Sequence, residues 1–172
     1  MKMTAAPVLV LCLASAGVAH ASSPADTVLV DQRGAAFTLS ALRGAPLIVA
    51  FVATRCTDAC PLVGALFAQL ARARIAAELV TITLDPGYDT PFVMSRYARA
   101  WGALAPHWRM ASGKPAAVET VIAALGVQRA AADVHSTFVY CLDARGRLVQ
   151  TLPLSTDTAR EVRVWLAGGS RH

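Results

Sequence analysis

The 172-residue chain has little charge, few aromatic residues and only four cysteines, and it shows no internal repeat or low-complexity segment. Charged residues make up 16% of the sequence and hydrophobic residues 55%, a balance that excludes a disordered chain. No run of basic residues alternates with aromatic ones, so nucleic acid is not an expected partner despite a formal net charge of +5. We expect one domain with its own core.

The chain also lacks an apolar run of the roughly 20 residues that a membrane-spanning helix needs. Its first residues instead have the pattern of a signal peptide: Lys2, an apolar stretch over 5–19, and the cleavage site Ala19-His20-Ala21. We predict a signal peptide over 1–21, in preference to a retained anchor, and a domain over 22–172 in the periplasm.

Cleavage would leave three cysteines, Cys56, Cys60 and Cys141. An odd number this small does not suit a disulfide-stapled scaffold, and the periplasm is an oxidising compartment where thiol chemistry is common. One close pair plus one further cysteine indicates a redox or metal site.

Apolar runs alternate with helical patterns along the chain, which predicts an α/β fold with one mixed sheet flanked by helices. A hairpin is expected near the N-terminus, and the first core strand, 47–52, reads as buried on both faces. The remaining predicted elements are strands over 78–84, 108–110, 137–142 and 147–152, and helices over 61–74, 91–101, 115–125 and 158–166. By analogy, a two-cysteine loop after the first core strand is typical of thioredoxin-like folds.

The pair Cys56 and Cys60 lies at the predicted start of a helix, next to Pro61. Because proline disfavours helical backbone angles in the residue before it, we expect Cys60 at the helix cap and Cys56 in the preceding loop. The helix N-terminus should lower the thiol pKa, with help from Arg55. Two thiolates three residues apart suit a soft ion such as Cu(I), or a reversible disulfide. The spacing alone leaves open a structural disulfide or two buried thiols.

His135 precedes a predicted strand whose start, in a thioredoxin-like topology, lies beside the cysteine loop. Its imidazole would complete a site of two sulfurs and one nitrogen, a set that can hold Cu(I) or, with one more ligand, Cu(II). A lone histidine can equally be structural.

Three motifs together resemble the Sco/SenC family over residues 30–166. They are Cys-x-x-x-Cys-Pro at 56–61, Asp-Pro-Gly-Tyr-Asp-Thr-Pro at 85–91, and Asp-Val-His-Ser at 133–136 followed by a strand and Asp-Ala-Arg-Gly at 143–146. The resemblance implies a thioredoxin fold and a membrane-side or periplasmic location. It also implies a role in assembling the dinuclear copper centre of cytochrome oxidase subunit II, as copper donor, thiol reductant or both. Cys56, Cys60 and His135 match the family's copper ligands.

Other residues carry open interpretations. Asp85 and Asp89 lie where α/β sites gather and could tune a metal from outside its ligand shell, or could serve capping and turn formation. Cys141 could be a further thiol or a small buried apolar residue. Met94 and Met110 are expected to fill the core.

We therefore expect a copper chaperone that passes copper by ligand exchange. The alternative is a thiol–disulfide oxidoreductase without metal, in which Cys56 attacks and Cys60 resolves the mixed disulfide. A thiol peroxidase fits less well. The expected partners are cytochrome c oxidase subunit II or another copper-receiving protein, a thioredoxin-like reductant, or another periplasmic copper carrier. We expect a monomer.

Overall fold

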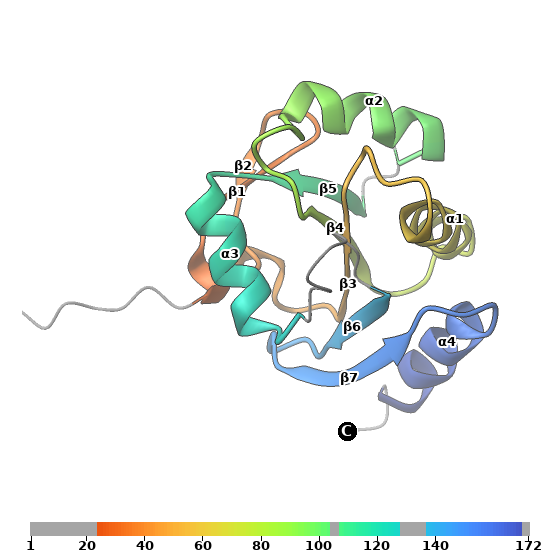
Figure 1. Ribbon diagram of the computed structural model, residues 1–172. Coiled ribbons are helices and arrows are strands. Elements are labelled where there is room, and N and C mark those ends of the chain that lie inside the picture. Colours follow the sequence, from red (N-terminus) through yellow and green to blue (C-terminus); the bar gives the residue numbers. More distant parts are fainter. Residues whose placement is uncertain (1–23, 104–106, 128–136, 170–172) are drawn as a thin grey trace, which may run out of the picture.

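A single seven-stranded sheet organises the computed structural model, which describes residues 24–103, 107–127 and 137–169 (Figure 1). The strands lie in the order β2-β1-β5-β4-β3-β6-β7. The elements in chain order are η1 (Pro24–Asp26), β1 (Leu29–Asp31), β2 (Ala36–Phe37), η2 (Ser40–Leu42), β3 (Leu47–Val52), α1 (Ala59–Arg72), β4 (Glu78–Thr83), α2 (Pro91–Trp101), β5 (Trp108–Ser112), α3 (Pro115–Ala124), β6 (Phe138–Leu142), β7 (Leu148–Pro153) and α4 (Thr158–Gly169).

The sheet is mixed, as the sequence predicts. Strand β4 lies between β3 and β5 and is parallel to both, whereas β6 pairs antiparallel with the other side of β3. Parallel neighbours require a crossover connection, which α1 supplies between β3 and β4 and α2 supplies between β4 and β5. Because β3 and β4 run in the same direction, the loops that leave them meet at one edge of the sheet.

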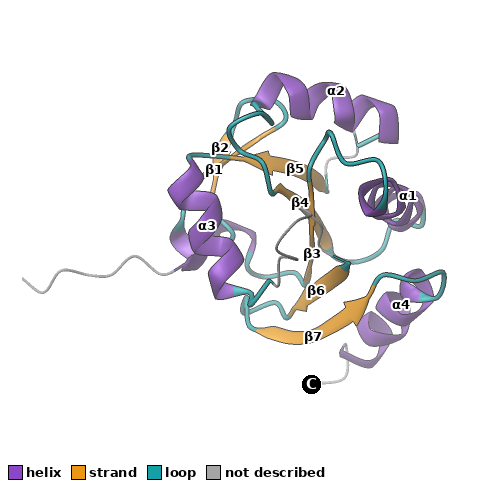
Figure 2. Cartoon of the chain, viewed as in Figure 1, coloured by secondary structure: helices purple, strands orange, loops and turns teal. Residues whose placement is uncertain are grey.

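Helices cover both faces of the sheet (Figure 2). Helices α1, α2 and α4 pack on one face, in a core that includes Phe67, Met94 and Val162. Helix α3 packs on the other face, in a core that includes Val118 and Phe51. Strand β3 is buried along its whole length, because side chains that alternate along it enter both cores. This burial explains why the sequence reads there as one continuous apolar run.

Two helix ends follow from residues close by in the chain. Thr90 caps α2, accepting a hydrogen bond from the Val93 N–H at 3.4 Å, and Pro91 takes the first helical position. Gly126 follows α3 with φ of +63°, a conformation that glycine adopts without steric cost. The N-terminal hairpin is present as β1 and β2.

Candidate functional site

The cysteine loop, residues 53–58, joins the carboxyl end of β3 to α1. Cys56 is half-buried, and its N–H donates to the Ala53 carbonyl at 2.9 Å in a tight turn. Cys60 lies one turn further on, inside α1, with 1% of its surface exposed. Both are free thiols in this structure, and their side chains are hydrogen-bonded to one another. The loop therefore presents one accessible sulfur with a second sulfur directly behind it.

The environment of Cys60 differs from the sequence expectation. Burial, followed by the hydrogen bond with Cys56, raises the pKa of Cys60 to about 12, even though the Ala53 N–H donates to its sulfur at 3.3 Å. The position at a helix N-terminus was expected to lower the thiol pKa. For Cys60 that expectation is wrong, because removing a thiolate from water outweighs the favourable dipole and hydrogen bond. Cys60 holds its proton at neutral pH.

The start of α1 also corrects the sequence analysis. The helix begins at Ala59, so Cys60 is its second residue and not its cap. Proline is tolerated in a first turn because the N–H groups there have no partner within the helix. Asp58 occupies the N-cap position but its side chain makes no capping hydrogen bond. Leu62, in the first turn of α1, points outward and is 60% exposed.

A buried carboxylate ties the cysteine loop to the next loop of the same edge. Asp89 is fully buried and accepts hydrogen bonds from the Thr54 N–H at 3.1 Å, from the Thr54 hydroxyl, and from the Thr83 hydroxyl at 2.6 Å. Its own N–H donates to the Asp85 carbonyl at 2.8 Å. The three donors to its carboxylate come from the cysteine loop and from the end of β4. Asp89 thus fixes the backbone two residues before Cys56.

Arg55 makes a second, exposed link between the same two loops. Its guanidinium donates to the Asp85 carboxylate at 2.5 Å and lies over the Tyr88 ring, 4.2 Å from the ring centre. The ion pair with Asp85 raises the pKa of Arg55. The sequence analysis assigned Arg55 a role in lowering the thiol pKa, whereas the structure directs its charge to Asp85 and Tyr88.

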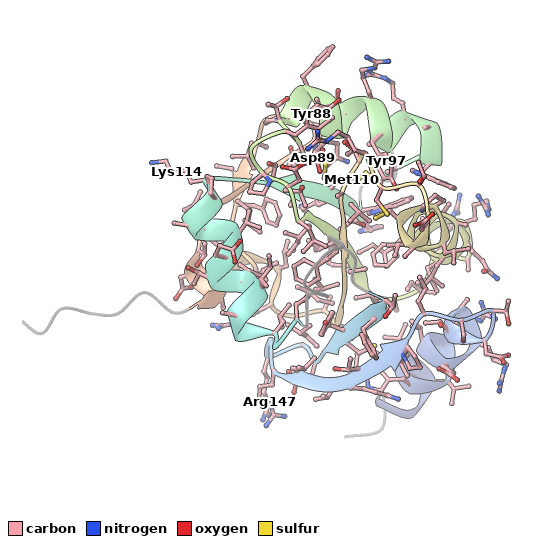
Figure 3. All side chains as sticks on the ribbon, in the orientation of Figure 1. Tyr88, Asp89, Tyr97, Met110, Lys114 and Arg147 are labelled. Atoms are coloured by element: carbon pink, nitrogen blue, oxygen red, sulfur yellow. The ribbon has the colours of Figure 1, made fainter. Side chains whose placement is uncertain are left out.

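Tyr97 of α2 is a contact that sequence reasoning missed. Its hydroxyl donates to the Cys60 carbonyl at 3.2 Å. Burial, with the nearby Cys60 sulfur, raises the pKa of Tyr97 to about 12, so it remains a neutral donor. In Figure 3, Asp89 and Tyr97 lie at the same end of the molecule, with Arg147 at the opposite end. A helical tyrosine gives no sequence signal for such a contact.

The other candidates fall outside the site or outside the described part of the chain. His135 and the signal peptide over 1–21 both lie outside the described residues. Cys141 is fully buried in the middle of β6, where burial raises its pKa to about 12, as expected for a small core residue. Met94 and Met110 are fully buried in the core.

No group of three or more histidine, cysteine or acidic side chains with metal-binding geometry occurs within 24–103, 107–127 and 137–169. In that same part of the chain, no helix has the length and apolar character needed to cross a membrane.

This chain is similar in sequence and in fold to known proteins. A model of the SCO1/SenC family matches residues 20–165. A curated SCO2-like protein of Rickettsia felis is 27% identical over 157 residues, which cover 83% of this chain and 75% of the relative. The structure of Bradyrhizobium japonicum ScoI with copper bound is 29% identical, with a TM-score of 0.67 over 83% of this chain and 96% of that one. BsSco is 16% identical, with a TM-score of 0.70 over 84% and 91% of the two chains. These matches confirm the thioredoxin-like fold and the resemblance seen in the sequence.

Proposed function

The chain belongs to the SCO1/SenC family, and from this premise we propose that it binds copper and takes part in assembling cytochrome c oxidase. Its task would be to deliver copper to the dinuclear copper site of subunit II, to reduce the thiols of that site, or both. Two relatives support this reading: Bradyrhizobium japonicum ScoI has been solved with copper bound, and BsSco is described as a member of the Sco family of cytochrome c oxidase assembly proteins.

The observation that carries the proposal is the contact between the thiol of Cys56, in the cysteine loop, and that of Cys60, in the first turn of α1. Thiolate sulfur is a soft ligand that suits Cu(I), and two sulfurs this close can approach a single ion. The half-exposed Cys56 gives copper access from solvent, while Cys60 supplies a second sulfur from a site closed to water. Because Cys60 is protonated at neutral pH, copper binding should release its proton.

His135 is the proposed third ligand. It precedes β6 by three residues, and the start of β6 lies toward the carboxyl end of β3, where Val139 is opposite Ala50. An extended chain covers at most about 3.6 Å per residue, so roughly 11 Å of chain separates residue 135 from the start of β6. That length allows the imidazole to reach the cysteine loop, which starts directly after β3.

The second candidate is a thiol–disulfide oxidoreductase, which the unequal exposure of the two sulfurs favours. The Cys56 thiolate would attack a disulfide of the target, forming a mixed disulfide and releasing one target thiolate. The Cys60 thiol would then lose its proton and attack Cys56, which closes the 56–60 disulfide and releases the second target thiol. Two electrons pass to the target, and a thioredoxin-like dithiol reductant would restore the pair.

Location is part of the proposal. We propose that the leader is cleaved after Ala21 and that residues 22–172 work in the periplasm. N-terminal sequencing of the protein recovered from a periplasmic fraction tests this. We expect Ser22 as the first residue. An intact N-terminus in the membrane fraction would instead show that the leader is retained as an anchor.

An anaerobic Cu(I) titration of reduced residues 22–172 against a calibrated competing chelator tests the copper site. We expect one tightly bound copper, lost in the Cys56→Ser/Cys60→Ser variant and weakened about tenfold or more in His135→Ala. Cys141→Ala is the matched control, because it removes the third cysteine from the core and should leave copper binding unchanged. Wild-type binding no tighter than that of the double variant would reject the copper function.

The oxidoreductase reading has its own assay. Metal-free wild-type protein should reduce a model disulfide, and Cys60→Ser should stop at the mixed disulfide on Cys56, visible by mass spectrometry. Copper binding without any reductase activity would favour the chaperone alone, and the reverse result would favour the oxidoreductase.

A further inference from the structure

Helices α1 and α2 both start at the sheet edge that carries the cysteine loop, because they follow the parallel strands β3 and β4. Each exposes a large apolar side chain in its first turn: Leu62 is 60% exposed and Phe92 is 69% exposed. Tyr88 lies between the two helix starts in sequence and is 45% exposed, with its ring against Arg55. Three exposed apolar groups therefore come from the segments that adjoin Cys56.

Direct contacts hold the first part of α1 to the second half of α2. Tyr97 of α2 donates to the Cys60 carbonyl, and Gly64 of α1 lies so close to Trp101 that a Cβ there would overlap the indole. Figure 1 shows α2 crossing the end of the molecule where the cysteine loop turns into α1. Leu62 follows the cysteine loop at the start of α1, and Tyr88 and Phe92 follow the loop that Asp85 and Asp89 join to it, so the three apolar groups adjoin the cysteine loop from two sides.

The charge on this face is mainly positive. Neither α1 nor α2 contains an aspartate or glutamate. Arg96 and Arg99 are exposed and lie four and seven residues after Phe92, a spacing that puts all three on one side of α2. The carboxylates nearby are Asp58, exposed before α1, and Asp85, which is paired with Arg55.

A groove extends the face along α1. It has a volume of about 620 Å³ and is lined by residues that include Leu62, Leu66, Arg72 and Leu154. An apolar side chain of a partner protein could enter it beside Leu62, and Arg72 adds positive charge at its wall.

We propose that Leu62, Tyr88 and Phe92, flanked by Arg96 and Arg99, form a docking face for a protein with an acidic surface around an apolar centre. This inference rests on the proposed function, since the partner would be the copper-receiving protein that must approach Cys56. Burying exposed apolar side chains at the centre of a contact supplies most of its affinity, and opposite charges at the rim speed the encounter. A second copy of this chain is a poor occupant, because each copy would carry a net positive charge, +4 for residues 22–172 once Lys2 is removed from the +5 of the full chain.

The test is copper transfer from the loaded protein to the purified, copper-free soluble domain of a bacterial cytochrome oxidase subunit II, followed by stopped-flow absorbance. Phe92→Ser/Leu62→Ser should slow transfer about tenfold at every salt concentration. Arg96→Glu/Arg99→Glu should slow it about tenfold at low salt, and the loss should shrink at about 0.5 M salt because screening weakens interactions between exposed charges. Both variants should bind Cu(I) as the wild type does.

Matched controls come from α4, which lies away from the cysteine loop. Val164→Ser removes an apolar side chain that is 64% exposed, and Arg163→Glu reverses an exposed charge. Transfer at the wild-type rate in the face variants, or an equal loss in the controls, would overturn the docking face and leave the proposed function intact. A loaded wild type that passes no copper to the domain would reject this recipient and, with it, the docking assignment.

Discussion

Asp31 in the N-terminal hairpin and Asp89 beside the cysteine loop are both buried, yet the structure satisfies them in different ways. Asp31 accepts hydrogen bonds from the Arg33 and Ala35 N–H groups at 2.8 and 3.0 Å, and from the Arg33 guanidinium. Asp89 is held by two hydroxyls and an N–H, and the Thr54 donor lies 35 residues earlier in the chain.

Asp31 therefore stabilises a local turn, whereas Asp89 joins two loops that are far apart in the sequence; we call this second arrangement the Asp89 clamp. The Asp31 carboxylate is bonded to Arg33 and Ala35, both within four residues of it, so the turn can form without the rest of the domain. The turn between β6 and β7 is built the same way, with Asp143 bonded to the Arg145 N–H and to Arg147. Asp89 can be satisfied only when β4 and the cysteine loop are already in place. The hairpins organise themselves, whereas the site depends on the assembled sheet edge.

Of the substitutions that test this difference, Asp89→Ala should have the largest effect on stability. The substitution would leave two buried hydroxyls and the Thr54 N–H without their acceptor, and we expect a loss of about 3 kcal/mol in the free energy of unfolding. Urea denaturation measures it, and Cu(I) affinity should fall in the same variant because the backbone before Cys56 loosens. Asp89→Asn keeps one acceptor oxygen and should lose less. Equal stabilities of the two variants would contradict the clamp.

Gly64→Ala tests whether helix packing also holds the site region. A helical glycine normally gains stability on replacement by alanine. Here the new Cβ would overlap the Trp101 indole, so we expect a loss of about 2 kcal/mol, measured by thermal or urea unfolding. Combining the change with Trp101→Leu should recover part of the loss, since the smaller side chain removes the overlap. A stabilised Gly64→Ala protein would show that α2 can move away from α1.

The Asp31 turn should make the stability of the protein depend on pH. Burial alone would raise the pKa of Asp31, but the Arg33 guanidinium and the Arg33 and Ala35 N–H groups outweigh it and lower the pKa below 3.8. A carboxyl whose pKa is lower in the folded state adds stability above its unfolded pKa and loses it as the pH falls through the folded pKa. We expect about 1 kcal/mol of stability to be lost as the pH falls below 3.8.

Arg33→Gln is the matched variant for this measurement, because it removes the guanidinium and keeps both backbone donors. Urea unfolding at a series of pH values should show a shallower acid loss in the variant than in the wild type. Identical slopes would mean that the guanidinium does not act on Asp31.

The smallest expected effect is at the N-cap of α2. Thr90→Ala removes the acceptor of the Val93 N–H, an exposed bond of 3.4 Å, and should lower the free energy of unfolding by about 0.5 kcal/mol, while Thr90→Ser should restore it. Thr90 follows Asp89 directly, so the comparison also shows how far a local cap contributes to the site edge. A loss as large as that of Asp89→Ala would mean that the cap, and not the carboxylate, organises this edge.

The sequence by itself determined the alternation of strands and helices, the caps at Thr90 and Gly126, and the loop that carries Cys56 and Cys60. These features follow from short-range physics: the spacing of apolar residues, the backbone limits of proline and glycine, and hydrogen bonds between near neighbours. The same reasoning named Asp85 and Asp89 as residues near the site.

Only the tertiary structure decided what those residues contact. Thr54 and Thr83 meet Asp89, Tyr97 meets Cys60, and Leu62 remains exposed, because each outcome depends on where β3, β4 and α2 lie in space. The raised pKa of Cys60 follows from burial in the assembled core, a quantity that no local pattern contains. The sequence determines which residues are near each other along the chain. Packing determines how far each side chain is exposed to solvent and which groups it contacts, and these set its chemistry.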